Sequence, residues 1–163
     1  MTTTTKGTAK VATPEAHQIL ITREFGAPPA LVWRAYTTPD LIKRWWAGQR
    51  GTVTSAEVDL RVGGRWRYVM DAGGHEVAFR GEYREIDEPA RLVNTEIYEG
   101  LPDPDDHASV VTVTFTPGGT GGTTVRMLCE YRDQADRDAV LSTGMEGGMQ
   151  ESLDALDEVA AGL

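Results

Sequence analysis

Between residues 52 and 131, apolar and polar residues alternate with a period of two, which is typical of strands that bury one face. Trp66, Tyr68 and Met70, for example, are separated by Arg67 and Val69. The alternation continues at Val77, Phe79, Gly81 and Tyr83, at Val111, Val113 and Phe115, and at Val125, Met127, Cys129 and Tyr131. A register slip of one residue would turn each of these faces to water, so the pattern predicts six consecutive strands.

The segment before these strands predicts one more strand and two short helices. Residues 17–25 form the first strand, which ends at an alanine followed by two prolines. Pro29 and Pro39 stand at the expected helix starts, where proline is tolerated because its missing N–H would have no partner there. Thr38 is the expected N-cap of the second helix.

After Tyr131 the apolar period changes to 3.6 residues, which predicts a long C-terminal helix. Asp133 is the expected N-cap, and an apolar stripe runs from Leu141 to Val159. We expect one continuous helix from about Asp133 to Ala161, lying across the concave face of the sheet.

Glycines and methionines gather inside this expected helix, at Gly144, Met145, Gly147, Gly148 and Met149. Each glycine costs a helix about 1 kcal/mol relative to alanine, so their presence needs a reason. In one interpretation the glycines let the helix approach the sheet and the methionines fill the gap. In the other, the missing side chains leave room for a ligand, to which the flexible thioethers adapt.

The order of elements predicts an α+β domain with an antiparallel sheet. The chain has 163 residues, which suits a single domain with its own core. We expect a flexible N-terminal tail over residues 1–16, because this segment is rich in threonine and poor in apolar residues, and one domain over residues 17–163.

The composition of the chain limits the kinds of partner and the cellular compartment that we expect for the protein. The net charge is −9, which argues against nucleic acid and anionic membranes as partners. No apolar run is long enough to span a membrane, and the N-terminus has no signal-peptide pattern, so we expect no membrane insertion. The single cysteine, Cys129, cannot form an internal disulfide and suits a reducing cytoplasm, so we expect a cytoplasmic protein.

Familiar catalytic and metal-binding motifs are absent from the sequence. The three histidines are expected at the surface, and the acidic loop around Asp103, Asp105 and Asp106 lacks the spacing of a calcium loop. Cys129 is expected to be a small buried residue rather than a nucleophile. We therefore assign no metal, no cofactor and no catalytic residue.

Five sequence blocks, in this order, carry a resemblance to a known family. They are APPALVWRAYTTPDLIKRWW, VDLRVGGRWR, GEYREIDEPARLVNTE, TVTFTPGGTGGTTVRM and GMEGGMQESLDALDEVA. Together they resemble the START-like SRPBCC superfamily, in particular the branch named after the activator of a heat-shock chaperone ATPase. The resemblance implies a helix-grip fold, in which a curved antiparallel sheet of about six or seven strands wraps around the C-terminal helix and encloses a cavity.

The resemblance and the strand parity together predict the residues that line this cavity. Gly63 and Gly64 are expected only to form the tight entry to a strand. The predicted ligand-binding residues are Trp46, Trp66, Tyr68, Met70, Phe79, Tyr83, Val113, Phe115, Met127, Tyr131, Met145 and Met149.

Within this superfamily, which includes lipid-binding proteins, polyketide cyclases and many bacterial members, two functions are considered for such a cavity. The first is binding of a small apolar or amphipathic molecule; the second is cyclase-, aromatase- or hydrolase-like catalysis on an aromatic or polyketide-type substrate. We assign no carboxylate or histidine to the inward faces, which favours binding. A chaperone-associated interaction module, using the edge at Trp45 and Trp46, is the third alternative, and a homodimer stays open.

Overall fold

The computed structural model describes residues 8–163, and its elements follow the predicted order with two differences. The strands are β1 (Lys10–Ala12), β2 (Gln18–Phe25), β3 (Thr52–Val58), β4 (Arg65–Asp71), β5 (Glu76–Asp87), β6 (Arg91–Tyr98), β7 (Ser109–Pro117) and β8 (Thr123–Glu130). The helices are α1 (Pro29–Thr37), α2 (Pro39–Trp45), α3 (Gln134–Ser142) and α4 (Met145–Ala161), with short 3-10 turns η1 (Pro104–His107) and η2 (Gly119–Gly121).

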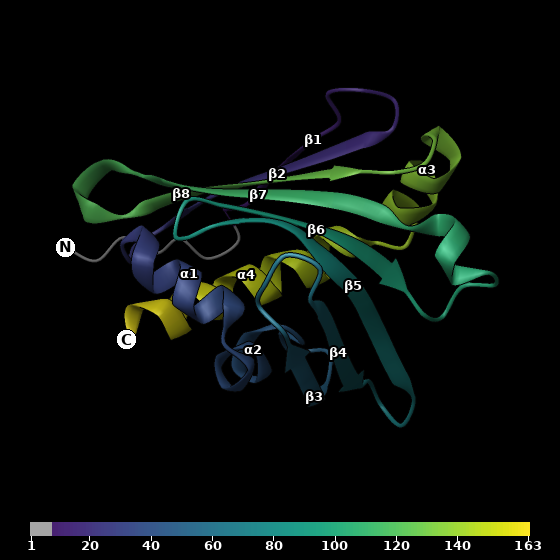
Figure 1. Ribbon diagram of the computed structural model, residues 1–163, viewed down its shortest axis with the longest axis horizontal. Coiled ribbons are helices and arrows are strands. Elements are labelled where there is room, and N and C mark those ends of the chain that lie inside the picture. Colours follow the sequence, from purple (N-terminus) through teal and green to yellow (C-terminus); the bar gives the residue numbers. More distant parts are fainter. Residues whose placement is uncertain (1–7) are drawn as a thin grey trace.

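All eight strands form one antiparallel sheet in the order β1-β2-β8-β7-β6-β5-β4-β3. The sheet is open and strongly curved, and α4 lies along its concave side, with α1 and α2 packed against α4 (Figure 1). The α+β fold with a C-terminal helix held by an antiparallel sheet is therefore confirmed. None of the described helices is long and apolar enough to cross a membrane.

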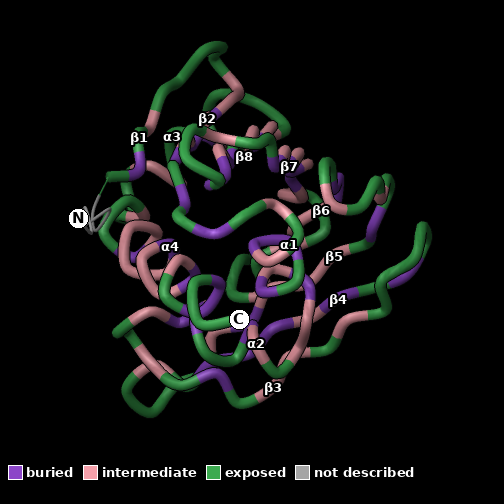
Figure 2. Tube along the Cα trace, turned by 90° about the vertical axis from the view of Figure 1, so that its left-hand side faces the viewer, coloured by how far each residue is buried: buried purple, intermediate pink, exposed green. Residues whose placement is uncertain are grey.

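The core lies between the inner face of the sheet and the helices, as the buried segments in Figure 2 show. Leu153, Leu156 and Val159 of α4 pack into the same cluster as Val113 and Phe115 of β7. These three α4 residues are spaced three apart and therefore share one side of the helix. The apolar stripe in the sequence thus marks the side of α4 that faces the sheet.

The expected N-terminal tail includes a strand. Residues 10–12 form β1, which pairs antiparallel with β2, for example Val11 with Ile21. In addition, the side chain of Gln150 on α4 bonds both the backbone N–H and the carbonyl of Ala9. The ordered domain therefore begins before residue 17, while residues 1–7 of the expected tail lie outside the described part.

The expected continuous C-terminal helix is broken into α3 and α4, which corrects the prediction. Asp133 does cap α3, since its side chain accepts a hydrogen bond from the Asp136 N–H at 2.9 Å. The break falls at Gly144, whose φ of 74° is left-handed and incompatible with a right-handed helix. Gly144 therefore lies between two helices and not inside one, and α4 begins at Met145 with a new direction.

Polar contacts hold the C-terminal part of α4 in place. Arg23 of β2 is 2% exposed and bonds Asp154 at 2.9 Å, and its guanidinium stacks over the Phe25 ring. The Gly26 N–H donates to Asp157, and the Ser152 hydroxyl donates to the carbonyl of Trp46 at 2.7 Å. Each of these contacts comes from the part of α4 that follows Met149.

Candidate functional site

The predicted ligand-binding residues all lie on the inner face of the sheet, on α4 or beside α2. Eleven of them belong to the main core or pack against it: Trp46, Trp66, Tyr68, Phe79, Tyr83, Val113, Phe115, Met127, Tyr131, Met145 and Met149. Met70 does not join this group. It packs in a small separate cluster with Ala47 and Val53, near the end of β4.

Burial divides these residues into two sets. Trp66, Tyr68, Tyr83, Val113 and Phe115 are buried, as is Met70. The other set keeps part of its surface accessible although its members pack against the core: Trp46, Phe79, Met127, Tyr131, Met145 and Met149. The members of this set come from the end of α2, from β5, from β8 and the residue after it, and from the first turns of α4.

A carboxyl group lies among these residues, which corrects the sequence analysis. Glu96 of β6 has the same parity as Leu92, a core residue that is 1% exposed. Its side chain is partly accessible, yet burial raises the pKa of its carboxyl to about 7. Glu96 forms no hydrogen bond or ion pair with any side chain among residues 8–163.

Phenols and a thiol lie within electrostatic range of Glu96. The carboxylate helps to raise the pKa of Tyr36, Tyr68, Cys129 and Tyr131, although burial is the larger cause in every case. The pKa of Cys129 reaches about 12. All four groups therefore remain neutral at physiological pH, and Glu96 is the group in this set that titrates near neutrality.

Two pairs of these side chains lie close together. Tyr68 lies beside Tyr83, whose pKa burial raises to about 12, and Tyr131 lies beside Cys129. Cys129 is thus a buried, neutral thiol, as the sequence analysis expected. Tyr36 of α1 was not foreseen as a site residue; its ring packs edge-on against Phe115 and stacks with Trp45.

Aromatic rings continue from these phenols toward β5. Trp46 stands edge-on to both Tyr68, at 5.4 Å between centroids, and Phe79, at 5.6 Å. Phe79 in turn stacks with Tyr98, which lies two residues beyond Glu96 on β6. Glu96 therefore borders an aromatic wall that connects β4, β5 and the end of α2.

The two glycines near the start of α4 differ in their surroundings. A Cβ on Gly148 would overlap the guanidinium of Arg50, whereas a Cβ on Gly147 would meet open space. The missing side chain of Gly148 therefore makes room for Arg50. This corrects, at this position, the interpretation that the glycines leave space for a ligand.

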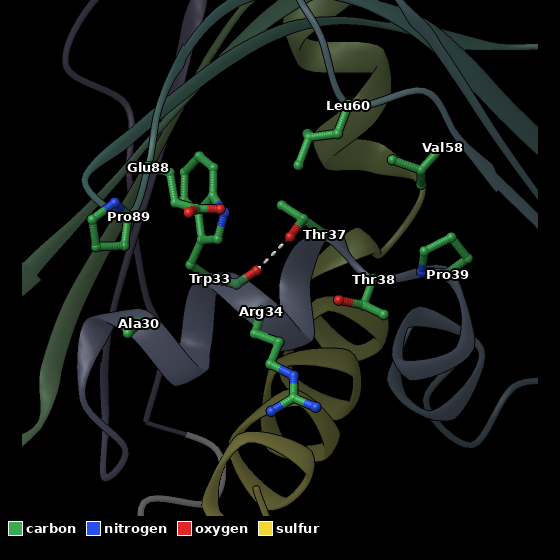
Figure 3. A pocket seen from close by; sticks show the side chains of 10 residues that line it. All are labelled: Ala30, Trp33, Arg34, Thr37, Thr38, Pro39, Val58, Leu60, Glu88 and Pro89. Carbon is green, nitrogen blue, oxygen red and sulfur yellow. Dashed lines mark hydrogen bonds between the residues drawn. The ribbon is translucent and has the colours of Figure 1, made fainter.

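A separate pocket of about 640 Å³ opens outside the sheet–helix interior, between α1, the start of α2 and the turns after β3 and β5 (Figure 3). Trp33, Arg34 and Leu60 are among its lining residues. The Thr37 hydroxyl donates to the Trp33 carbonyl at 2.8 Å at its base. None of the predicted site residues lines this pocket.

No group of histidine, cysteine and carboxylate side chains within residues 8–163 is arranged to hold a metal ion. His107, in the acidic loop, instead contacts Asp136 at 3.0 Å and so connects η1 to α3.

Comparison with known proteins places the chain in a family. The family described as activator of Hsp90 ATPase homolog 1-like protein matches residues 26–161. The chain belongs to this family. Among the curated proteins, none matches the chain.

Solved structures of bacterial proteins share the architecture of this family member. A protein from Rhodobacter sphaeroides is 27% identical, with a TM-score of 0.86 over 95% of this chain and 99% of that chain. A protein from Mycobacterium smegmatis is also 27% identical, with a TM-score of 0.79 over 94% and 95%. An activator-like protein of the same family from Aeromonas hydrophila is 27% identical, with a TM-score of 0.65 over 89% and 92%.

Proposed function

We propose that this family member binds a small, mainly apolar molecule with one polar group, between the inner face of the sheet and the start of α4. The observation that carries the proposal is the partly accessible set of residues that packs against the core. Phe79, Met127, Met145 and Met149 pack against the core and yet keep accessible surface. Apolar surface in that position contributes nothing to stability until something covers it.

The chemistry of this set fits such a ligand. Small-molecule sites are mainly apolar, with a few polar groups that fix the orientation of the ligand. Here methionine and aromatic side chains supply the apolar part, and methionines adapt to different ligand shapes. Glu96 and the phenols of Tyr36 and Tyr131 supply the polar part.

The arrangement of α4 supports entry of the ligand near its first turns. The helix contacts that bond Ala9, Arg23, Gly26 and the carbonyl of Trp46 all come from residues 150–157. Met145 and Met149 precede this anchored part and follow the break at Gly144. This end of α4 therefore has fewer constraints against the small movements that admit a ligand.

A second candidate function is proton transfer on a bound substrate, of the cyclase or aromatase type. Glu96 favours it, because a general acid or base works best when its pKa lies near the working pH, and burial raises the pKa of this carboxyl to about 7. In that case Glu96 is the catalytic residue and the phenols orient the substrate.

The binding proposal is tested with the Met149→Trp variant and the uncharged dye Nile red. The larger indole is expected to occupy the space beside Met149, so dye binding should fall at least tenfold while the melting temperature stays equal or rises. The matched control is Leu60→Trp, which places the same indole in the separate pocket and should leave dye binding unchanged.

Two outcomes contradict the proposal. If Met149→Trp strongly destabilises the fold, the space beside Met149 is already filled, because overpacking a dense core costs about 1–3 kcal/mol. If Leu60→Trp removes dye binding and Met149→Trp does not, the dye occupies the separate pocket and the interior is not the site.

A further inference from the structure

We propose that Glu96 selects ligands whose polar group is a protonated amine, so that the interior prefers apolar amines to alcohols or acids of the same shape. This inference rests on the proposed function, since it concerns the ligand of the same site. It starts from a carboxyl group that the fold leaves without a partner. Glu96 is partly accessible and lies on an inner face lined mainly by apolar and aromatic side chains, so a cation that enters there finds a carboxylate that no side chain among residues 8–163 occupies.

The buried cations of the described chain are paired away from Glu96. The two buried cationic side chains within residues 8–163 are Arg23 and Arg137. Arg23 bonds Asp154, and Arg137 bonds Asp138 and the carbonyls of Glu15 and Gln18. Both belong to other parts of the fold.

The groups that face Glu96 are neutral. They are Tyr36 from α1, Tyr68 from β4, Cys129 from β8, and Tyr131, which directly follows β8. Tyr83 of β5 is also neutral, because burial raises its pKa to about 12, and the residues from α4, Met145 and Met149, do not titrate. An ammonium group beside Glu96 would therefore be attracted by its negative charge, and the cation that the structure places against this end of α4 is Arg50, at Gly148.

The aromatic wall beside Glu96 favours the same chemistry. A cation is attracted to the negative face of an aromatic ring, and the stacked rings of Phe79 and Tyr98 lie close to Glu96, since Tyr98 is two residues beyond it on the same face of β6. The whole chain adds to this preference, because a net charge of −9 raises the local concentration of cations. A carboxylate ligand would meet repulsion from the same charges.

Three naphthalene probes of matched shape test the inference: naphthalene-1-methylamine, naphthalene-1-methanol and naphthalene-1-carboxylate. At pH 8 we expect the amine to bind at least about tenfold more tightly than the alcohol, because a hydrogen bond to a charged group is worth more than a neutral one. The carboxylate should bind weakest. Titration calorimetry measures the three affinities.

The pH dependence separates a charge effect from a shape effect. Below pH 7 Glu96 becomes protonated, so amine affinity should fall as the pH is lowered, by up to about tenfold per pH unit. The alcohol should show little change over the same range. In the Glu96→Gln variant the amine should lose its advantage and its pH dependence, while the alcohol keeps its affinity within about threefold.

The matched control is Glu82→Gln, which removes one negative charge from an exposed position on β5 and should change none of the three affinities. If the alcohol binds but the amine has no advantage, this inference is wrong and the proposed binding function stands. Tighter binding of the carboxylate would overturn the inference in the same way. If none of the probes binds, both proposals fail.

Discussion

The sharpest prediction for the unliganded protein concerns the effect of Glu96 on stability. Burial moves the pKa of this carboxyl from 4.5 to about 7. Each pKa unit corresponds to about 1.4 kcal/mol, so the ionised form costs the folded state at most about 3.5 kcal/mol. Because the folded pKa is above the unfolded value, stability is highest below pH 4.5 and is lost as the pH rises through 7.

Glu96→Gln removes this titration and keeps the shape of the side chain. The free energy of unfolding, from urea denaturation, is compared between the variant and the wild type at several pH values from 5 to 8.5. The stability of the variant relative to the wild type should increase by about 2–3 kcal/mol across this range, with most of the change completed by pH 8.

The test is how the difference in unfolding free energy between variant and wild type changes with pH. The size of this difference at a single pH does not decide the outcome. The cost of placing a glutamine amide in this interior does not depend on pH, and other titrating groups cancel in the difference where they are independent of residue 96. Glu82→Gln serves as the control, and its unfolding free energy relative to the wild type should not change with pH. A flat difference for Glu96→Gln, within about 0.5 kcal/mol, would mean that Glu96 is solvated or paired and would refute the reasoning.

Three further predictions concern the helices. Gly147→Ala should stabilise the protein by up to about 1 kcal/mol, since its Cβ meets open space. Gly148→Ala should gain less because Arg50 has to move away, and this difference should disappear in an Arg50→Ala background, which a double-mutant cycle measures. Asp133→Ala should cost about 1 kcal/mol through loss of the α3 cap, and Asp133→Asn should recover most of it in urea denaturation.

Much of the fold could be predicted from the sequence because one-sided burial leaves a regular pattern. The alternation at Trp66, Tyr68 and Met70 placed all three on the inner face, and the 3.6-residue stripe marked the buried side of α4. Strand β1 could not be recognised in this way. Its three residues are mainly exposed, and pairing with β2 through the backbone leaves no trace in the side chains.

Glu96 was missed because β6 has apolar residues on both faces. Leu92 and Tyr98 share the parity of Glu96, whereas Val93 and Ile97 have the opposite parity. The strand sequence therefore fits either orientation, and only the pairing of β6 with β5 and β7 settles which face is inward. The break at Gly144 was missed for a related reason, since the apolar stripe continues across it and a single left-handed residue does not disturb the pattern.

The ionisation of Glu96 in the complex distinguishes the two candidate functions. An ammonium ligand stabilises the carboxylate and lowers its pKa, so binding near pH 6 should release close to one proton per ligand. Proton transfer makes the opposite demand, because a general acid or base has to keep its pKa near the working pH while the substrate is bound. Calorimetry in buffers of different ionisation enthalpy counts the protons released. Release of about one proton supports a binding protein for apolar amines, whereas no release with the amine would leave Glu96 free to exchange protons with a substrate.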